Sequence, residues 1–219
     1  MSTTTELKTV KPAPPPTIPM GRRGVELTTL EDTFRFATAV VQAGVATKGD
    51  SAQTVAIKIQ MGAEVGLPPM ASIQNIAVIN GRPSIWGDAM LGVCRASGLF
   101  DEASFAENVT TTTGKLIEAT CTVRRLPDGK PITRRFSTED ANVAGLSGKS
   151  GPWQQYPRRM LQLRARSWAL RDGFADVLRG MRAAEEERDI VVPAEPVDTL
   201  DELTERLTGE QAKPPEVEP

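Results

Sequence analysis

The sequence predicts an α+β protein, in which a small, mostly antiparallel sheet with hairpins packs against helices. Segments with helical periodicity lie on both sides of a region in which apolar and polar residues alternate. Turn signals at Asn80 and Gly81 and at residues 127–130 divide that region as hairpins require. A long basic helix is expected after Pro157, because strong helix formers follow it and no glycine occurs between residues 158 and 171.

Composition divides the chain into three parts. Residues 1–27 are rich in threonine and proline and predict a disordered arm. Residues 28–182 predict the folded domain, and residues 183–219 predict an acidic, mostly disordered tail. The net charge is +6 over residues 21–182 and −9 over residues 183–219. A basic body with an acidic tail favours nucleic-acid binding, or a tail that competes with it, although such a tail can equally serve solubility alone.

Two amphipathic helices are expected first. Thr29 is a suitable N-cap for a helix that Gly44 ends, and Ser51 caps a second helix that runs to about Glu64. The apolar positions predicted to face the core are Leu30, Phe34, Ala37 and Val41 in the first helix and Val55, Ile59 and Ala63 in the second. A short helical turn is expected to begin at Pro68 and Pro69.

The middle of the chain predicts strands with one helix between them. Residues 75–85 form a hairpin whose second arm is an edge strand, because Pro83 cannot donate a ladder hydrogen bond. A helix over residues 86–98, ended by Gly98, precedes strands at 103–108, 116–126 and 131–137. Thr138 is expected to cap a short helix before the basic stretch.

Residues 148–182 contain eight basic residues and only two acidic ones. On a helical wheel, two apolar stripes alternate with arginines; they are Leu161, Ala165 and Trp168, and Leu163, Leu170 and Phe174. Two stripes indicate a helix wedged between layers or subunits, with arginines along the seams. The pattern leaves two interpretations open, a surface helix with solvated charges and a phosphate-binding element.

A resemblance favours the second interpretation. Residues 151–174, GPWQQYPRRMLQLRARSWALRDGF, resemble the signature of the RecT/Red-beta family of phage single-strand annealing proteins. The matching positions are Trp153, Pro157, Arg159, Met160, Leu161, Ala165 and Phe174. Residues 62–98 are similar to a second block of that family, so the resemblance spans roughly residues 29–182. It implies a sheet crossed by a long helix that lines a DNA groove, with Arg158, Arg164 and Arg171 contacting DNA.

The candidate DNA-binding residues lie on the basic stretch and on the preceding hairpin. They are Lys149, Trp153, Tyr156, Arg158, Arg159, Arg164, Arg166 and Arg171, with Arg124, Arg125, Arg134 and Arg135. Arginine binds phosphate through its planar fork, and the indole and phenol rings offer stacking faces for unpaired bases. For Trp168 a place in the core is preferred to a role as a base platform.

Residues that catalyse covalent chemistry are scarce. The chain has no histidine, and Cys94 and Cys121 are isolated, so neither a zinc site nor a disulfide framework is expected. The segment GLSGKS lacks the first glycine of a phosphate-binding loop, because Val143 occupies that position. Asp128 and Gly129 indicate a hairpin turn rather than part of a metal nuclease. We therefore expect no enzyme activity and no cofactor, ATP and metal included.

The sequence predicts an ATP-independent protein of phage or prophage recombination and DNA repair that anneals single strands. It would bind single-stranded DNA and the annealed duplex as a homo-oligomer, a ring or a helical filament, in the bacterial cytoplasm and away from membranes. The resemblance implies a phage 5'-3' exonuclease and the host single-strand-binding protein as partners. Alternatives are a passive single-strand-binding protein and a subunit of a DNA-processing enzyme.

Overall fold

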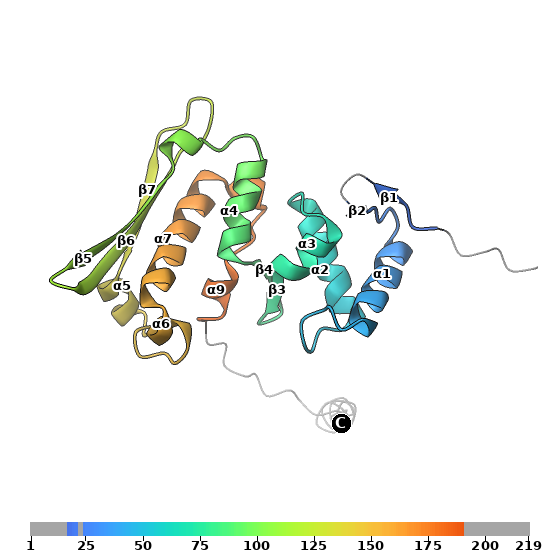
Figure 1. Ribbon diagram of the computed structural model, residues 1–219. Helices are drawn as coiled ribbons and strands as arrows, with labels where there is room; N and C mark the ends of the chain where they lie inside the picture. The colour runs from blue at the N-terminus through green and yellow to red at the C-terminus, as the bar shows by residue number, and fades with distance from the viewer. Residues whose placement is uncertain (1–16, 22–23, 191–219) are drawn as a thin grey trace, which may run out of the picture. The chain divides into compact units, whose positions relative to one another are not determined.

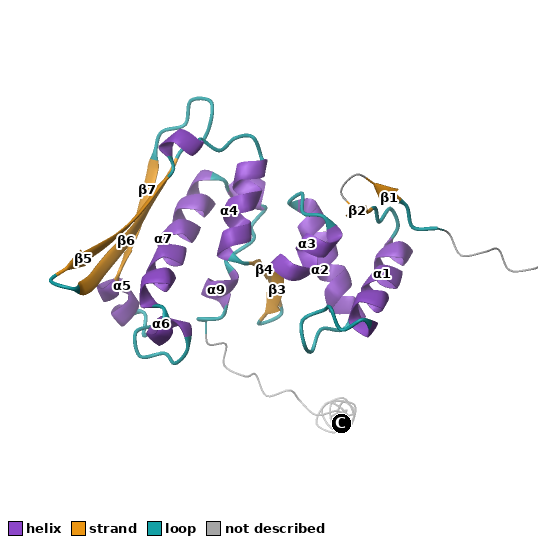
Figure 2. Ribbon diagram, in the orientation of Figure 1, coloured by secondary structure: helices purple, strands orange, loops and turns teal. Residues whose placement is uncertain are grey.

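The structure is a computed structural model that describes residues 17–21 and 24–190. It confirms the α+β class, since small antiparallel sheets pack against helices (Figures 1 and 2). Part of the predicted N-terminal arm is folded, because β1 (Met20–Gly21) and β2 (Gly24–Val25) pair as an antiparallel hairpin. The rest of that arm, residues 1–16 and 22–23, lies outside the described residues, as does most of the predicted tail, residues 191–219.

The first helices form a small core of their own. They are α1 (Leu30–Gln42), α2 (Ala52–Glu64) and α3 (Pro69–Asn75). Both predicted N-caps are confirmed: Thr29 Oγ1 accepts a hydrogen bond from Asp32 N at 3.0 Å, and Ser51 Oγ accepts one from Thr54 N at 3.1 Å. The core they build contains Ala37, Val40, Val55, Ala56, Ile59 and Ile73.

The predicted apolar faces of these helices are partly wrong. Leu30 and Phe34 are 71% and 38% exposed, because α1 buries the stripe of Ala37 and Val40 instead. Ala63 is exposed as well. The reason is Gly62, which packs so closely on α3 that a Cβ atom there would lie 1.9 Å from Ser72 Oγ. This contact turns the neighbouring Ala63 away from the core.

The hairpin predicted at Asn80 and Gly81 is confirmed. Strands β3 (Ile76–Ile79) and β4 (Arg82–Ile85) pair in a two-stranded sheet, and the two turn residues have φ values of 51° and 71°. Positive φ at both central positions is the requirement of the tight turn that this dipeptide favours. The helix that follows, α4 (Gly87–Ala96), ends before Gly98, as expected.

The main sheet has the order β5-β6-β7 and is antiparallel throughout. Its strands are β5 (Ala106–Thr112), β6 (Lys115–Val123) and β7 (Ile132–Ser137). The first strand begins later than predicted, because Asp101 accepts a hydrogen bond from Ala103 N and starts a 3-10 turn over Glu102–Ser104. Ser137 rather than Thr138 caps α5 (Thr138–Val143), since Ser137 and Asp140 form a reciprocal capping box.

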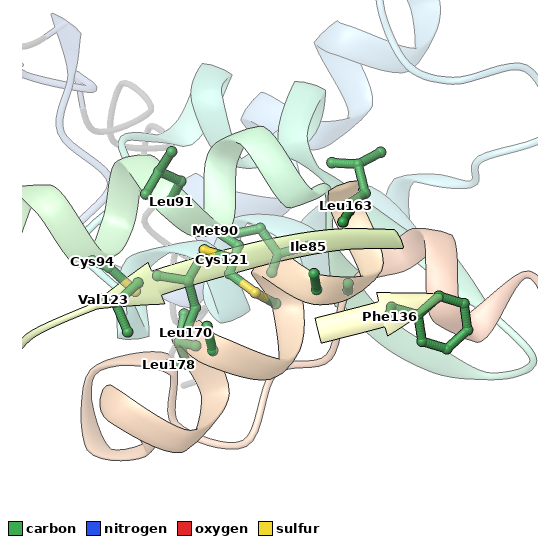
Figure 3. Close-up of a cluster of buried hydrophobic side chains, with 14 of the residues drawn as sticks. Ile85, Met90, Leu91, Cys94, Cys121, Val123, Phe136, Leu163, Leu170 and Leu178 are labelled. Carbon is green, nitrogen blue, oxygen red and sulfur yellow. The ribbon is translucent and has the colours of Figure 1, made fainter. Parts of the chain in front are cut away.

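The long basic helix is enclosed by its neighbours. It follows the short helix α6 (Pro152–Gln155) and is α7 (Pro157–Gly173), with Pro157 in its first turn. The three-stranded sheet lies against one side of α7, and α4 lies against another (Figure 1). Figure 3 shows Cys121 and Val123 of the sheet, Leu163 and Leu170 of α7, and Met90 of α4 in one buried cluster. The prediction of a helix wedged between layers is therefore confirmed.

The folded unit continues past the predicted boundary at residue 182. After α8 (Ala175–Leu178) the chain passes beside β4, where Ala183 and Ile85 form a parallel bridge, and then forms α9 (Ala184–Glu187). We call residues 183–189 the C-terminal strap. Its two alanines are buried in the core, so this part of the acidic segment is folded, and the compact unit ends at Asp189.

Candidate nucleic-acid interface

Nearly all of the predicted DNA-binding cations have carboxylate partners within the protein. Among the ten predicted lysine and arginine residues, the structure gives every one except Arg158 at least one ion pair. The partners come from the sheet, from the cap of the 3-10 turn before it, from α4, from the end of α7 and α8, and from the C-terminal strap. Each of these nine cations therefore already binds an oxyanion, namely a carboxylate of the protein itself.

Two of the hairpin arginines are paired near the C-terminal end of α7. Arg125 grips Asp176 through two hydrogen bonds of 2.6 and 2.7 Å, and Arg134 pairs with Asp172. The hydrogen bonds from Arg125 lower the pKa of Asp176 to about 2. Arg124 lies 3.3 Å from an oxygen of Asp101. The pairs of Arg125 and Arg134 tie the hairpin to α8 and α7, whereas that of Arg124 ties it to the residue before the 3-10 turn.

Arg135 points away from α7. It is on the outer face of the sheet, is mostly exposed and lies 3.3 Å from Glu118 of the neighbouring strand. A pair of this kind contributes little to stability, because both groups are close to water.

The middle of α7 faces the C-terminal strap. Arg164 and Lys149 both pair with Asp189, and Trp153 Nε1 donates a hydrogen bond to Asp189 Oδ2 at 2.9 Å. Two turns further along α7, Arg171 lies 3.3 Å from Glu186. The strap thus covers Arg164 and Arg171, two of the arginines that the sequence predicts to contact DNA.

Arg166 is the clearest correction to the predicted site. Its side chain is 5% exposed and makes two hydrogen bonds to Glu107 of β5, at 2.6 and 2.7 Å. A further nitrogen lies 2.6 Å from Asp88 of α4. Burial between α7, β5 and α4 leaves no room for a phosphate, so Arg166 joins three elements of the fold.

Arg159 lies beside this network and is more accessible. It shares Asp88 with Arg166, and Asp88 is itself 77% exposed. Burial acts to raise the pKa of Asp88, but the hydrogen bonds and charges of Arg159 and Arg166 outweigh it and hold that pKa below its ordinary value. Arg159 therefore carries a charge that solvent and ions can reach.

Two predicted residues are open to solvent at the start of α7. Tyr156 is 64% exposed, and Arg158 is exposed with no ion pair or hydrogen bond to any residue that the structure describes. Trp153, by contrast, is buried against Phe136, so its ring is no platform in an open groove. Trp168 meets Phe136 edge-on, with ring centroids 5.2 Å apart, in the core position that we preferred for it.

A cavity of about 240 Å³ lies between the C-terminal strap and the start of α7. Its lining is Trp86, Lys149, Ser150, Pro152, Trp153, Met160, Glu185, Arg188 and Asp189. Sequence reasoning missed the contributions of Trp86 and of the strap. The signal available for the strap was its alanine pair followed by acids, which the overall acidity of residues 183–219 obscured.

The two thiols, those of Cys94 and Cys121, are buried inside the protein. Burial raises the pKa of both Cys94 and Cys121 to about 12, so both thiols stay protonated at neutral pH. Within residues 17–21 and 24–190, no three histidine, cysteine, aspartate or glutamate side chains gather in a way that could hold a metal ion. None of the helices in these ranges combines the length and apolar character that a membrane span needs.

A scan against protein-family models and a comparison with curated proteins found no match to this sequence.

Proposed function

We propose that this protein binds single-stranded DNA through its backbone phosphates and anneals complementary strands without ATP. The observation that carries the proposal is the row of arginine–carboxylate pairs along α7 and the β6–β7 hairpin. A guanidinium that holds a carboxylate in a bidentate fork, as Arg125 holds Asp176, has the geometry that binds a phosphodiester. The resemblance of residues 151–174 to the RecT/Red-beta signature supports the same proposal.

At the exposed ion pairs, a DNA phosphate can compete with the carboxylate for the arginine, because little free energy holds the pair together. Exposed ion pairs contribute only about 0–1 kcal/mol each, so a polyanion that meets several arginines at once can displace their partners. Arg125, Arg134, Arg135 and Arg159 are all at least one-third exposed as side chains. Arg158 requires no displacement and provides the first contact.

Annealing then needs no covalent step. The arginines reduce the repulsion between two phosphate backbones, the bases remain free to pair, and base pairing supplies specificity and driving force. In this proposal the protein acts as a homo-oligomer, a ring or a helical filament, in the bacterial cytoplasm. It belongs to phage or prophage recombination and works beside a 5'-3' exonuclease and the host single-strand-binding protein.

The decisive assay mixes two complementary dye-labelled oligonucleotides with and without protein, in the absence of nucleotide triphosphates. We expect faster pairing with the protein present. Slower pairing would favour the second candidate, a passive single-strand binder that protects DNA. Absence of binding at low salt would refute both candidates.

A salt series tests the phosphate contacts directly. Arg158→Ala should lower the salt dependence of binding by about one released counterion. Lys48→Ala is the matched control, because Lys48 is an exposed cation in the loop between α1 and α2, outside the proposed interface. Equal effects of the two substitutions would show that net charge, and not position, determines binding.

A further inference from the structure

The carboxylate of Asp189 occupies a cradle of three nitrogen donors. Lys149 Nζ lies 3.2 Å from one carboxylate oxygen, and Trp153 Nε1 donates to the other at 2.9 Å. Arg164 donates to that second oxygen as well. Trp153 is buried, and the Arg164 side chain is only 12% exposed, so neighbouring side chains fix both donors. Two cations and an indole N–H around one anion make a preformed oxyanion-binding site.

The guanidinium of Arg164 is held in place by aromatic rings. Its central carbon lies 5.6 Å from the centroid of Phe136 and 5.8 Å from that of Trp153. These contacts orient the fork independently of Asp189. The cradle therefore keeps its shape when its anion is exchanged for another.

The 240 Å³ cavity opens directly beside this cradle, since Lys149, Trp153 and Asp189 line both. The indole of Trp86 also lines the cavity, with the Arg188 guanidinium 5.7 Å from its ring centroid. The cavity is smaller than the roughly 300–1,000 Å³ of pockets for drug-sized ligands, so its size suits a single planar ring system. An indole wall and an adjacent anion cradle fit the two ends of a nucleotide.

The side chain of Asp189 is placed so that it can move out of the cradle. It follows α9, and its side chain takes no part in the hydrogen bonding of a helix. Glu185, the other acid of the cavity, is committed elsewhere, because both of its carboxylate oxygens accept from Gly87 N at 3.1 Å. Rotation of the Asp189 side chain would release all three donors from the carboxylate, while Lys149 Nζ would keep its 3.0 Å hydrogen bond to Arg188 O.

We propose that the cradle and the cavity together form a site for one unpaired nucleotide of a DNA strand, and that Asp189 holds the phosphate position in the free protein. This inference rests on the proposed function and adds to it a specific site and a built-in competitor. The phosphate would replace the carboxylate on Lys149, Arg164 and the indole N–H of Trp153. The base would enter the cavity against Trp86.

The test compares binding of two fluorescent oligonucleotides of equal length, one of thymidylate and one abasic, by anisotropy at several salt concentrations. Asp189→Asn removes the competing charge and should raise the affinity for both at least about fivefold. The matched control is Glu31→Gln, which removes one negative charge from the exposed side of α1, outside the proposed interface.

Trp86→Leu separates base binding from phosphate binding. It should lower the affinity for thymidylate by about fivefold to a hundredfold, as the loss of one stacked base does, and leave the abasic strand unaffected. Equal losses on both strands would overturn the assignment of the cavity to a base. Thermal unfolding of each variant shows whether it is folded at the temperature of the assay.

Amine labelling of the wild-type protein gives a readout that requires no substitution. Bound DNA should protect Lys149 from acylation, measured by mass spectrometry, while Lys48 continues to react. Unchanged labelling of Lys149, or equal affinities of Asp189→Asn and Glu31→Gln, would overturn the inference while binding persists. If neither the wild type nor any variant binds DNA at low salt, the proposed function itself fails.

Discussion

Substitution of Arg166 distinguishes a structural arginine from a DNA-binding one. Arg166→Met keeps the length of the side chain and its apolar stem but removes the guanidinium between Glu107 and Asp88. The Glu107 side chain is only 11% exposed and would lose its main partner, keeping one hydrogen bond from Gln162 Nε2 at 2.7 Å. A buried carboxylate left in this way is the costly outcome of breaking an ion pair.

The two halves of the network should differ in magnitude. Breaking a buried pair by removing one partner costs about 3–5 kcal/mol, so Arg166→Met should lower the free energy of unfolding by that amount. Asp88→Asn should cost less than about 1 kcal/mol, because Asp88 is 77% exposed and water replaces much of what it loses. The double substitution Arg166→Met with Glu107→Leu should recover most of the loss, since no unpaired charge is left behind.

Urea denaturation of the three variants and the wild type measures these differences, and strand binding is measured on the same samples. We expect Arg166→Met to be less stable but, while folded, to bind single-stranded DNA as the wild type does. Wild-type stability combined with loss of DNA binding would refute the reasoning. It would mean that the guanidinium faces the ligand and not Glu107.

Three further predictions concern the reactivity of the thiols, the stability at acid pH and a helix cap. Cys94 and Cys121 should resist a thiol reagent at pH 8 in the native protein and both react after unfolding, and a fast native reaction would contradict their burial. The pKa of Asp176 falls from 3.8 to about 2 on folding. Its carboxylate therefore stabilises the protein fully at pH values above 3.8, and this contribution is lost as the pH falls towards 2. Thermal unfolding midpoints of the wild type and Asp176→Asn should therefore converge between about pH 4 and pH 2, and parallel curves would count against the pair. Ser137→Ala should lower the free energy of unfolding by about 1 kcal/mol through loss of the capping box, whereas Ser147→Ala in an exposed loop should change it little.

Local signals in the sequence were sufficient for most of the fold. The turn at Asn80 and Gly81, the caps at Thr29 and Ser51 and the start of α7 at Pro157 each follow from one or two residues with a specific backbone preference. The errors arose where tertiary contacts decide. The buried side of α1 depends on what α2 and α3 present to it, and periodicity alone could not choose between its neighbouring stripes.

The candidate site was harder to predict, because its character depends on pairs that are distant in the sequence. The charge count of residues 148–182 shows where the cations are, but Arg166 meets Glu107, and Arg164 meets Asp189, only through the packing of the sheet and the strap on α7. A net charge describes what a segment carries and not what its neighbours neutralise. Only Arg158, among the predicted cations that the structure describes, makes no ion pair or hydrogen bond with another described residue.

The order of elements along the chain bears on how α7 is completed during synthesis. The sheet and α4 precede α7, so they are available to it as soon as it leaves the ribosome, but the strap is made last. Until residue 189 has emerged, Arg164 and Arg171 lack the carboxylates that cover them in the finished fold. A nascent chain therefore presents to the crowded, RNA-rich surroundings of the ribosome a more cationic surface than the mature protein does.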